Sequence, residues 1–144
     1  MLKIKVINKS KNPLPKYQTL GASGLDLHAN IDAPITLSKN DIVLVPTGLY
    51  IEIPDGYEAQ IRSRSSLALK HGIFCLNSPA TIDSDYRGEL KIILAALTDK
   101  PFTINAGDRI AQMVFAKVEK AEFEEVKELS DSIRGEGGFG STNI

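Results

Sequence analysis

Residues 49–61 read LYIEIPDGYEAQI, and this stretch decides the fold class. Apolar and polar side chains alternate over residues 49–53 and again over residues 57–61, on either side of Pro54-Asp55-Gly56. A period of two predicts strands with one buried face, and a Pro-Asp-Gly sequence predicts a turn between them. The stretch therefore predicts half-buried antiparallel strands joined by short turns.

Similar segments, bounded by Gly, Pro, Asn or Asp, recur along the chain. The further predicted strands are residues 2–6, 25–29, 42–45, 90–97, 109–118 and a weaker 122–129. Only residues 65–70 are predicted to be helical, with Ser65 and Ser66 as caps and Gly72 at the end. This pattern favours an all-β sandwich, jelly roll or closed barrel over strands that alternate with long helices.

The composition is that of an ordinary globular protein, since 42% of the 144 residues are hydrophobic and 24% are charged. With Lys+Arg 17, Asp+Glu 18 and a net charge of -1, the chain lacks the basic character that a nucleic-acid polymer would require. Its longest apolar run, residues 92–97, is too short to cross a bilayer. We therefore expect a cytoplasmic protein without a membrane partner, in which the single Cys75 is buried and reduced.

The C-terminal stretch differs from the rest of the chain. Residues 134–142 read RGEGGFGST and hold four of the eleven glycines, which opposes a strand or helix. We expect a single β domain over residues 1–133, followed by a flexible C-terminal arm over residues 134–144.

Two polar stretches precede or open predicted elements. ASGLDL at residues 22–27 places Asp26 at the start of a strand, where a solvated aspartate in a turn is the alternative. RSS at residues 64–66 places a guanidinium group and hydroxyls at a predicted helix start, where phosphate binds readily. A serine-capped helix with surface arginines is the alternative here.

The densest polar stretch is NSPATIDSDYRG at residues 77–88. It combines the Asn77 amide, which could read a base edge, with two carboxylates and the planar ring of Tyr86. A carboxylate held in a cleft could orient and deprotonate water. A polar hairpin loop with Tyr86 as a packing residue is the alternative.

Two further stretches offer polar groups. GDRIAQMV at residues 107–114 predicts a turn with Asp108 and Arg109 paired locally, then a strand in which Gln112 needs backbone, water or ligand partners. The arm offers a cation, hydroxyls and the Phe139 ring to a nucleotide, although it lacks the lysine of a Walker A loop. A disordered terminus is the alternative. No Cys or His pair has the spacing of a zinc site, whereas aspartates could serve Mg²⁺ through water.

In this order and spacing, the five stretches resemble the five motifs of the trimeric dUTP pyrophosphatases (dUTPases) over roughly residues 14–143. The resemblance implies a jelly-roll-like β fold of the β-clip type and a homotrimer with active sites at subunit boundaries. It also implies Mg²⁺ dependence and hydrolysis of dUTP to dUMP and pyrophosphate by water attack at the α-phosphate. This reaction removes dUTP and supplies dUMP for dTMP synthesis.

The resemblance further implies a role for each motif residue. Asp83 would activate the attacking water and hold the deoxyribose 3′-OH, and Asp26 would act on Mg²⁺ through coordinated water. Asn77 would read the uracil edge, and Tyr86 would pack under the deoxyribose and exclude a 2′-OH. The arm would close over the active site, with Phe139 covering uracil. The other implied substrate contacts are Arg64, Ser65, Ser66, Thr81, Ile82, Gln112, Arg134, Gly140, Ser141 and Thr142. All of these except Thr81, Ile82 and Gly140 would contact phosphates.

Two alternatives share this β scaffold. A dCTP deaminase would attack the base with a different acid–base residue, and a non-catalytic nucleotide-binding trimer would keep the fold without turnover. The 82–88 stretch and the complete arm favour the pyrophosphatase over the deaminase, and Asp83, Arg134 and Phe139 oppose a non-catalytic protein. The sequence departs from the family pattern at one place. The family often has a small flexible residue, usually Gly, before the Thr-Ile-Asp sequence, whereas this chain has Pro79-Ala80.

Overall fold

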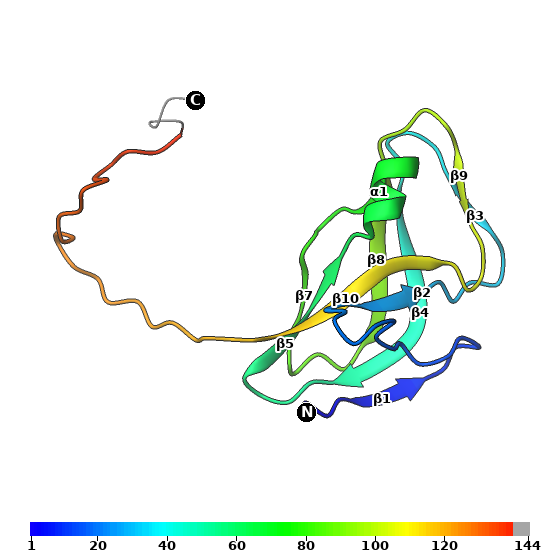
Figure 1. Ribbon diagram of the computed structural model, residues 1–144, viewed down its shortest axis with the longest axis horizontal. Helices are drawn as coiled ribbons and strands as arrows, with labels where there is room; N and C mark the ends of the chain where they lie inside the picture. The colour runs from blue at the N-terminus through cyan, green and yellow to red at the C-terminus, as the bar shows by residue number, and fades with distance from the viewer. Residues whose placement is uncertain (140–144) are drawn as a thin grey trace.

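The computed structural model describes residues 1–139 and shows a body of β-strands from which the C-terminal segment projects (Figure 1). All strand pairs in the described part are antiparallel, which confirms the all-β fold class. The strands are β1 (Lys5–Asn8), β2 (Leu25–His28), β3 (Ile35–Leu37), β4 (Ile42–Glu52), β5 (Tyr57–Arg62), β6 (Ile73–Cys75), β7 (Ala80–Ile82), β8 (Glu89–Ala96), β9 (Phe102–Ile104) and β10 (Arg109–Lys117), and the helix is α1 (Ser65–His71).

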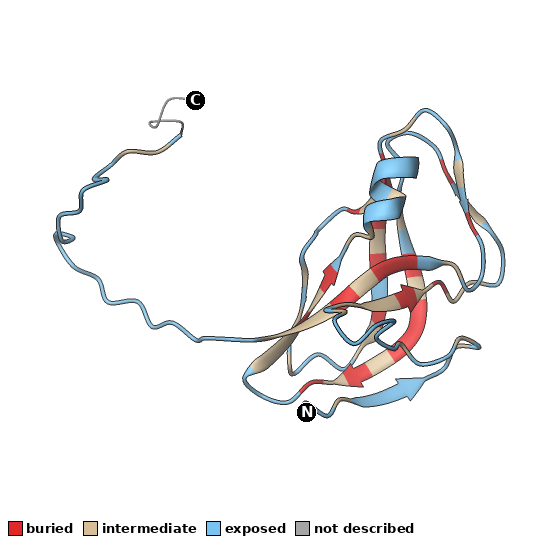
Figure 2. Ribbon diagram, in the orientation of Figure 1, coloured by how far each residue is buried: buried red, intermediate tan, exposed pale blue. Residues whose placement is uncertain are grey.

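Two four-stranded sheets enclose the core. One has the strand order β1-β4-β8-β6 and the other β2-β10-β5-β7, while β3 and β9 form a separate two-stranded ribbon. Buried residues lie on strands of both sheets (Figure 2). They belong to one hydrophobic cluster, which contains Val45 and Leu94 from the first sheet and Leu27 and Ile61 from the second. Two sheets around a shared core are the arrangement of a jelly-roll-like fold.

The turn at residues 54–56 joins the two sheets and not two paired strands. β4 pairs with β1 and β8, whereas β5 pairs with β10 and β7. The Tyr57 N–H donates to the Pro54 carbonyl at 3.2 Å. Gly56 has a φ of 77°, a left-handed conformation that glycine adopts without strain. The turn is therefore the corner at which the chain crosses from one sheet to the other.

The predicted strands 42–45 and 49–53 are parts of one 11-residue strand, β4. Its register with β8 shifts between Pro46 and Tyr50, which is the mark of a β-bulge. Thr47 lies buried in this bulge, and its hydroxyl donates to the Leu90 carbonyl at 2.7 Å. The bulge lets the strand continue through a proline that the sequence pattern treats as a boundary.

Helix α1 forms where the sequence predicts it and ends at Gly72, which is left-handed and donates its N–H to the Ala68 carbonyl. The predicted capping by Ser65 and Ser66 is wrong, because Arg64 is the N-cap residue and makes no side-chain cap hydrogen bond. Both serines lie exposed in the first turn. Among residues 1–139, no helix is long and apolar enough to span a membrane.

The predicted strand 122–129 is wrong, because residues 118–139 contain neither strand nor helix. After β10 the chain runs away from the body (Figure 1), and the side chains of Phe123 and Leu129 are exposed. A strand requires backbone hydrogen bonds to a neighbour. Within residues 1–139 this segment pairs with no other strand.

Cys75 is buried on β6, as the apolar run around it predicts. Its backbone N–H donates to the Ser63 hydroxyl at 2.8 Å. Burial raises the pKa of the Cys75 thiol, and the contact with Ser63 offsets part of that rise. The thiolate form is therefore disfavoured, as expected for a structural and unreactive cysteine.

Candidate active site

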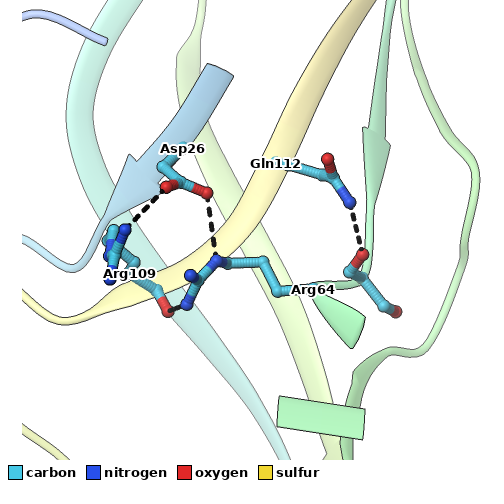
Figure 3. A network of polar contacts seen from close by, with 5 residues as sticks. Asp26, Arg64, Arg109 and Gln112 are labelled. Carbon is cyan, nitrogen blue, oxygen red and sulfur yellow. Dashed lines mark hydrogen bonds and ion pairs between the residues drawn. The ribbon is translucent and has the colours of Figure 1, made fainter. Parts of the chain in front are cut away.

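Asp26 joins β2 to two arginines from distant parts of the chain (Figure 3). Its Oδ1 accepts a hydrogen bond from Arg64 Nε at 3.0 Å, and its Oδ2 accepts one from Arg109 Nη1 at 3.1 Å. Arg64 Nη1 also donates to the main-chain carbonyl of Arg109 at 3.0 Å. We call Asp26, Arg64 and Arg109 the arginine network.

The Asp26–Arg64 pair of this network is largely shielded from water, whereas half of the Arg109 side chain is exposed. The Asp26 side chain is 15% exposed and that of Arg64 is 20% exposed. Ion pairs in such surroundings are screened less than pairs on an open surface. The alternative of a solvated Asp26 in a turn is therefore wrong.

Gln112 lies beside this network, because it is the cross-strand partner of Asp26 in the β2–β10 register. Its Nε2 donates to the Ser63 carbonyl at 2.9 Å, so a backbone group satisfies the amide (Figure 3). A Cβ atom at Gly24 would overlap Oε1 of Gln112. An alanine at this position, just before β2, would therefore require the end of the Gln112 side chain to move.

A cavity of about 520 Å³ lies beside β7, β8 and the loop that joins them. The predicted site residues Thr81, Ile82, Asp83 and Tyr86 line it. The Tyr86 hydroxyl donates to the Glu89 carbonyl at 3.0 Å. We call this space the Asp83 cavity.

Gly88 sets the position of the Tyr86 ring. A Cβ atom at Gly88 would overlap the ring and the hydroxyl of Tyr86. A glycine at this position therefore lets the ring fold back along its own loop, at the wall of the Asp83 cavity.

Asp83 follows β7 and starts a turn in which its carbonyl accepts the Tyr86 N–H at 3.2 Å. The side chain of Arg87 closes the loop, since its Nη1 donates to the carbonyls of Ser84 at 2.6 Å and of Tyr86 at 2.9 Å. The exposed Asp83 makes no side-chain hydrogen bond or ion pair within residues 1–139. A molecule in the cavity therefore meets a carboxylate that is available to accept hydrogen bonds.

The arginine network and Asp83 lie at different levels of the β2-β10-β5-β7 sheet, Asp83 at the end of β7. β5 separates them: Gln112 lies opposite Arg62, whereas Ile82 lies opposite Ala59, which places Asp83 at the level of Glu58. Along β5, Glu58 and Arg62 are about 13 Å apart. Across the sheet, β10 and β7 are about 10 Å apart, because β5 lies between them. One chain thus does not bring Asp83 together with Gln112.

The remaining predicted residues are not gathered at either place. Asn77 lies exposed in the loop between β6 and β7. Arg134 Nε donates to the Gly137 carbonyl at 2.7 Å, and the Phe139 ring is exposed in the segment that leaves the body (Figure 1). Gly140, Ser141 and Thr142 lie outside the described residues.

The described residues restrict how a metal ion could bind. Within residues 1–139 no group of three or more His, Cys, Asp or Glu side chains is placed to hold a metal. Both oxygens of Asp26 already accept hydrogen bonds from arginines. These residues therefore do not form an all-protein cage, and an Mg²⁺ ion here would depend on water and substrate phosphates for its ligands.

Comparison with known proteins identifies the family. Residues 10–143 match the family model described as dUTPase. The chain belongs to the dUTPase family. It is 60% identical to the deoxyuridine 5′-triphosphate nucleotidohydrolase of Cytophaga hutchinsonii over 139 residues, which cover 96% of this chain and 90% of that protein. It is 55% identical to the protein of the same name from Finegoldia magna over 141 residues, covering 98% and 99% of the two chains.

A solved dUTPase structure has the same fold. It is the dUTPase of Staphylococcus bacteriophage 80alpha with dUPNHPP, which matches with a TM-score of 0.87 and 24% sequence identity over 99% of each chain. This match confirms the jelly-roll-like fold that the resemblance of this sequence to dUTPases implies.

Arg109 is a member of the arginine network that the sequence did not predict. The expected local pair with Asp108 is wrong, because the Asp108 carboxylate accepts the Asn105 N–H at 2.7 Å while Arg109 pairs with Asp26. Arg109 lies three residues before Gln112 on the same predicted strand. A cation so close to an amide that requires polar partners is the sequence feature that could have indicated its role. That spacing alone does not show which face of the strand the cation occupies.

Proposed function

We propose that this chain hydrolyses dUTP to dUMP and pyrophosphate, which removes dUTP and supplies dUMP for dTMP synthesis. The observation that carries the proposal is the Asp83 carboxylate at the cavity wall, which has no ion pair within residues 1–139, in a chain 52–60% identical to named deoxyuridine 5′-triphosphate nucleotidohydrolases. Neither the dCTP deaminase nor the non-catalytic trimer is favoured by these relatives.

Asp83 is the general base of this reaction. It accepts a proton from the water whose oxygen forms a new bond to the α-phosphorus. The bond from that phosphorus to the oxygen bridging to the β-phosphate breaks, and pyrophosphate leaves with the bonding electrons. The lack of any ion pair to Asp83 within residues 1–139 supports this role, because a carboxylate held by a cation is a weaker base. Asp83 also holds the deoxyribose 3′-OH.

The Asp83 cavity takes the nucleoside. Tyr86 packs under the deoxyribose, where its ring leaves no room for a 2′-OH, and Thr81 and Ile82 contact the substrate from β7. Asn77 reads the uracil edge from the loop that precedes this strand. Selection against ribose is thus steric, and selection of the base relies on hydrogen bonds.

The phosphates lie against Arg64, Ser65, Ser66 and Gln112. Phosphoryl transfer requires mainly that a protein position the reactants and neutralise charge, and these side chains offer a cation, two hydroxyls and an amide. Asp26 contacts Mg²⁺ through water. When bound, the ion supplies further neutralisation of the phosphate charge.

Each active site is shared between subunits of a homotrimer. The separation of Gln112 from Asp83 along and across one sheet supports this, because dUTP bound at one cavity needs phosphate contacts from another copy. The arm, residues 134–144, closes over the site, where Arg134, Ser141 and Thr142 contact phosphate and Phe139 covers uracil beside Gly140. The β domain comprises residues 1–133.

The proposed partners are dUTP and further copies of the chain, with no role for a nucleic-acid polymer or a membrane. The nearly balanced charge supports the first exclusion. A free buried cysteine is typical of a reducing compartment and supports a cytoplasmic location.

A substrate panel tests the proposed reaction. The purified protein is incubated with Mg²⁺ and dUTP, dCTP, dTTP or UTP, and pyrophosphate and ammonia are assayed separately. We expect pyrophosphate from dUTP and no ammonia from any nucleotide. Ammonia from dCTP would identify a deaminase, and binding of dUTP without product would identify a non-catalytic trimer.

Replacing Tyr86 by Ala is expected to raise kcat/KM for UTP relative to dUTP by about 10- to 100-fold, because removal of the ring opens space for a 2′-OH. Tyr86→Phe is the matched control. It removes the hydrogen bond to the Glu89 carbonyl but keeps the ring, so the UTP/dUTP ratio should stay at the wild-type value. A ratio that is unchanged in Tyr86→Ala would show that the ring does not select the sugar.

Replacing Gly24 by Ala is expected to lower kcat/KM for dUTP by about one to two orders of magnitude, because the added methyl group displaces the Gln112 amide. The melting temperature should change little, since the overlap is with the flexible end of the Gln112 side chain and not with backbone. Gly21→Ala is the control, because a Cβ atom there meets no atom within 4 Å. Equal activity of the two variants would contradict the role of this close approach.

A further inference from the structure

A bulge in β10 determines the face on which Arg109 lies. β10 pairs regularly with β2 from Met113 to Ala111, and the register then shifts before Arg109. The extra residue is Ile110, which is buried, as is Ala111. In a regular strand alternate residues share a face, so Arg109 would share the buried face of Ala111. The bulge instead places Arg109 on the outer face, where it reaches Asp26 (Figure 3).

Arg109 changes how Asp26 contacts Arg64. Asp26 gives one oxygen to each arginine, so Arg64 receives a single contact, at Nε. A carboxylate with both oxygens free prefers to bind a guanidinium group through two parallel hydrogen bonds. Without Arg109, Oδ2 of Asp26 would be free to take a second donor of Arg64. Asp26 would then contact Arg64 through two hydrogen bonds, which would use the Arg64 donors that a phosphate needs.

The arginine network keeps a donor and a positive charge for a ligand. Arg64 Nη1 is held by the Arg109 carbonyl, while Nη2 makes no hydrogen bond with residues 1–139. The two arginines outnumber the single carboxylate, so the network carries an excess positive charge. A lone pair of Asp26 and Arg64 would be neutral and would attract a triphosphate less.

We propose that Arg109 is a positioning residue for the triphosphate. It holds Asp26 through its side chain and Arg64 through its main-chain carbonyl, and so keeps Arg64 Nη2 open to a phosphate oxygen. The proposal rests on the phosphate-binding role of Arg64 proposed above. Arg109 acts through Asp26 and Arg64 and does not itself contact the substrate.

The test compares binding of dUPNHPP, which carries the triphosphate, with binding of dUMP, which lacks the two terminal phosphates. Arg109→Ala should weaken dUPNHPP binding by about tenfold, the lower end for a hydrogen bond to a charged group, and leave dUMP binding within about twofold. Arg109→Lys should recover most of the loss. Lys39→Ala removes a cation from the exposed ion pair with Asp99 and is the control for net charge.

A double-variant cycle separates an indirect role from a direct one. If Arg109 acts through Arg64, the variant carrying both Arg64→Ala and Arg109→Ala should bind dUPNHPP no more weakly than Arg64→Ala alone. Losses that add up would overturn the proposal, because they would show an independent contact. Equal weakening of dUMP and dUPNHPP by Arg109→Ala would also overturn it, since that is the effect of a general structural role.

The Arg64→Ala variant distinguishes a failure of the proposed phosphate-binding role of Arg64 from a failure of the inferred role of Arg109. If it leaves the ratio of the two dissociation constants unchanged, the phosphate role in the proposed function fails and the role of Arg109 fails with it. If Arg64→Ala changes the ratio and Arg109→Ala does not, only the inference about Arg109 is overturned. The Arg109 side chain is 50% exposed, so the folded state should tolerate Arg109→Ala, and thermal unfolding checks that both variants are folded.

Discussion

The Asp83→Asn variant is expected to bind dUPNHPP normally but to turn over dUTP about a thousandfold more slowly. The amide keeps the shape and the hydrogen-bonding capacity of the side chain and loses the basic oxygen that accepts the proton. Asp83 is exposed and its side chain makes no hydrogen bond or ion pair within residues 1–139, so the melting temperature should stay near that of the wild type. Steady-state kinetics, a binding titration and thermal unfolding measure the three quantities.

Asp85→Asn is the matched control for this experiment. It makes the same change of charge in the same turn, at another exposed aspartate that is not among the residues lining the Asp83 cavity. We expect its turnover to remain within a few-fold of the wild type. Similar losses in both variants would assign the effect to the charge of the loop, and near-normal turnover by folded Asp83→Asn would refute its role as the base.

Deletion of residues 134–144 is expected to leave a stable trimer whose activity on dUTP is about 100-fold lower. The segment before this deletion already lies outside the β body, and the Arg134 and Phe139 side chains are exposed, so no core residue described within residues 1–139 is lost. What is lost is the set of ligand contacts and the exclusion of water that the arm supplies. Size-exclusion chromatography with mass measurement and steady-state kinetics check the two halves of this expectation.

Refolding the deleted chain together with the Asp83→Asn chain tests whether the arm acts at the active site of its own subunit or at that of another subunit. If the arm serves another subunit, random assortment at equal amounts gives a base and an arm together in about one quarter of the sites. If the arm serves its own subunit, no chain in the mixture carries both. Mixed trimers, verified by mass, whose activity does not exceed the sum of the two parents would exclude an arm that acts between subunits.

Long elements were predictable from the sequence because their signals are local. β5, α1 and most of β8 and β10 follow an alternating pattern, an apolar run or a glycine stop that lies within the element itself. β3, β6, β7 and β9 were not predicted, because each has three residues and no readable period. They form because distant strands supply their hydrogen bonds, as β5 does for β7.

The residue types of the site were predictable, and the contacts between them were not. Asp26 and Arg109 are 83 residues apart and meet only because of the β2–β10 register and its bulge. The local rule that serines cap helices also failed at α1. There the chain enters the helix at Arg64, whose side chain is fixed by Asp26 from another strand.

The six residues of β5 set the spacing, within one chain, between Gln112, a proposed phosphate contact, and Asp83, the proposed general base. One edge of β5 pairs with β10, which carries Gln112. The other edge pairs with β7, which Asp83 follows. An insertion or deletion of one residue here would change the spacing by about 3.3 Å and reverse the faces of all residues beyond it. A substitution at an outer position such as Gln60 leaves the spacing intact. We therefore expect dUTP hydrolysis to tolerate replacement of the outward side chains of this strand better than any change in its length.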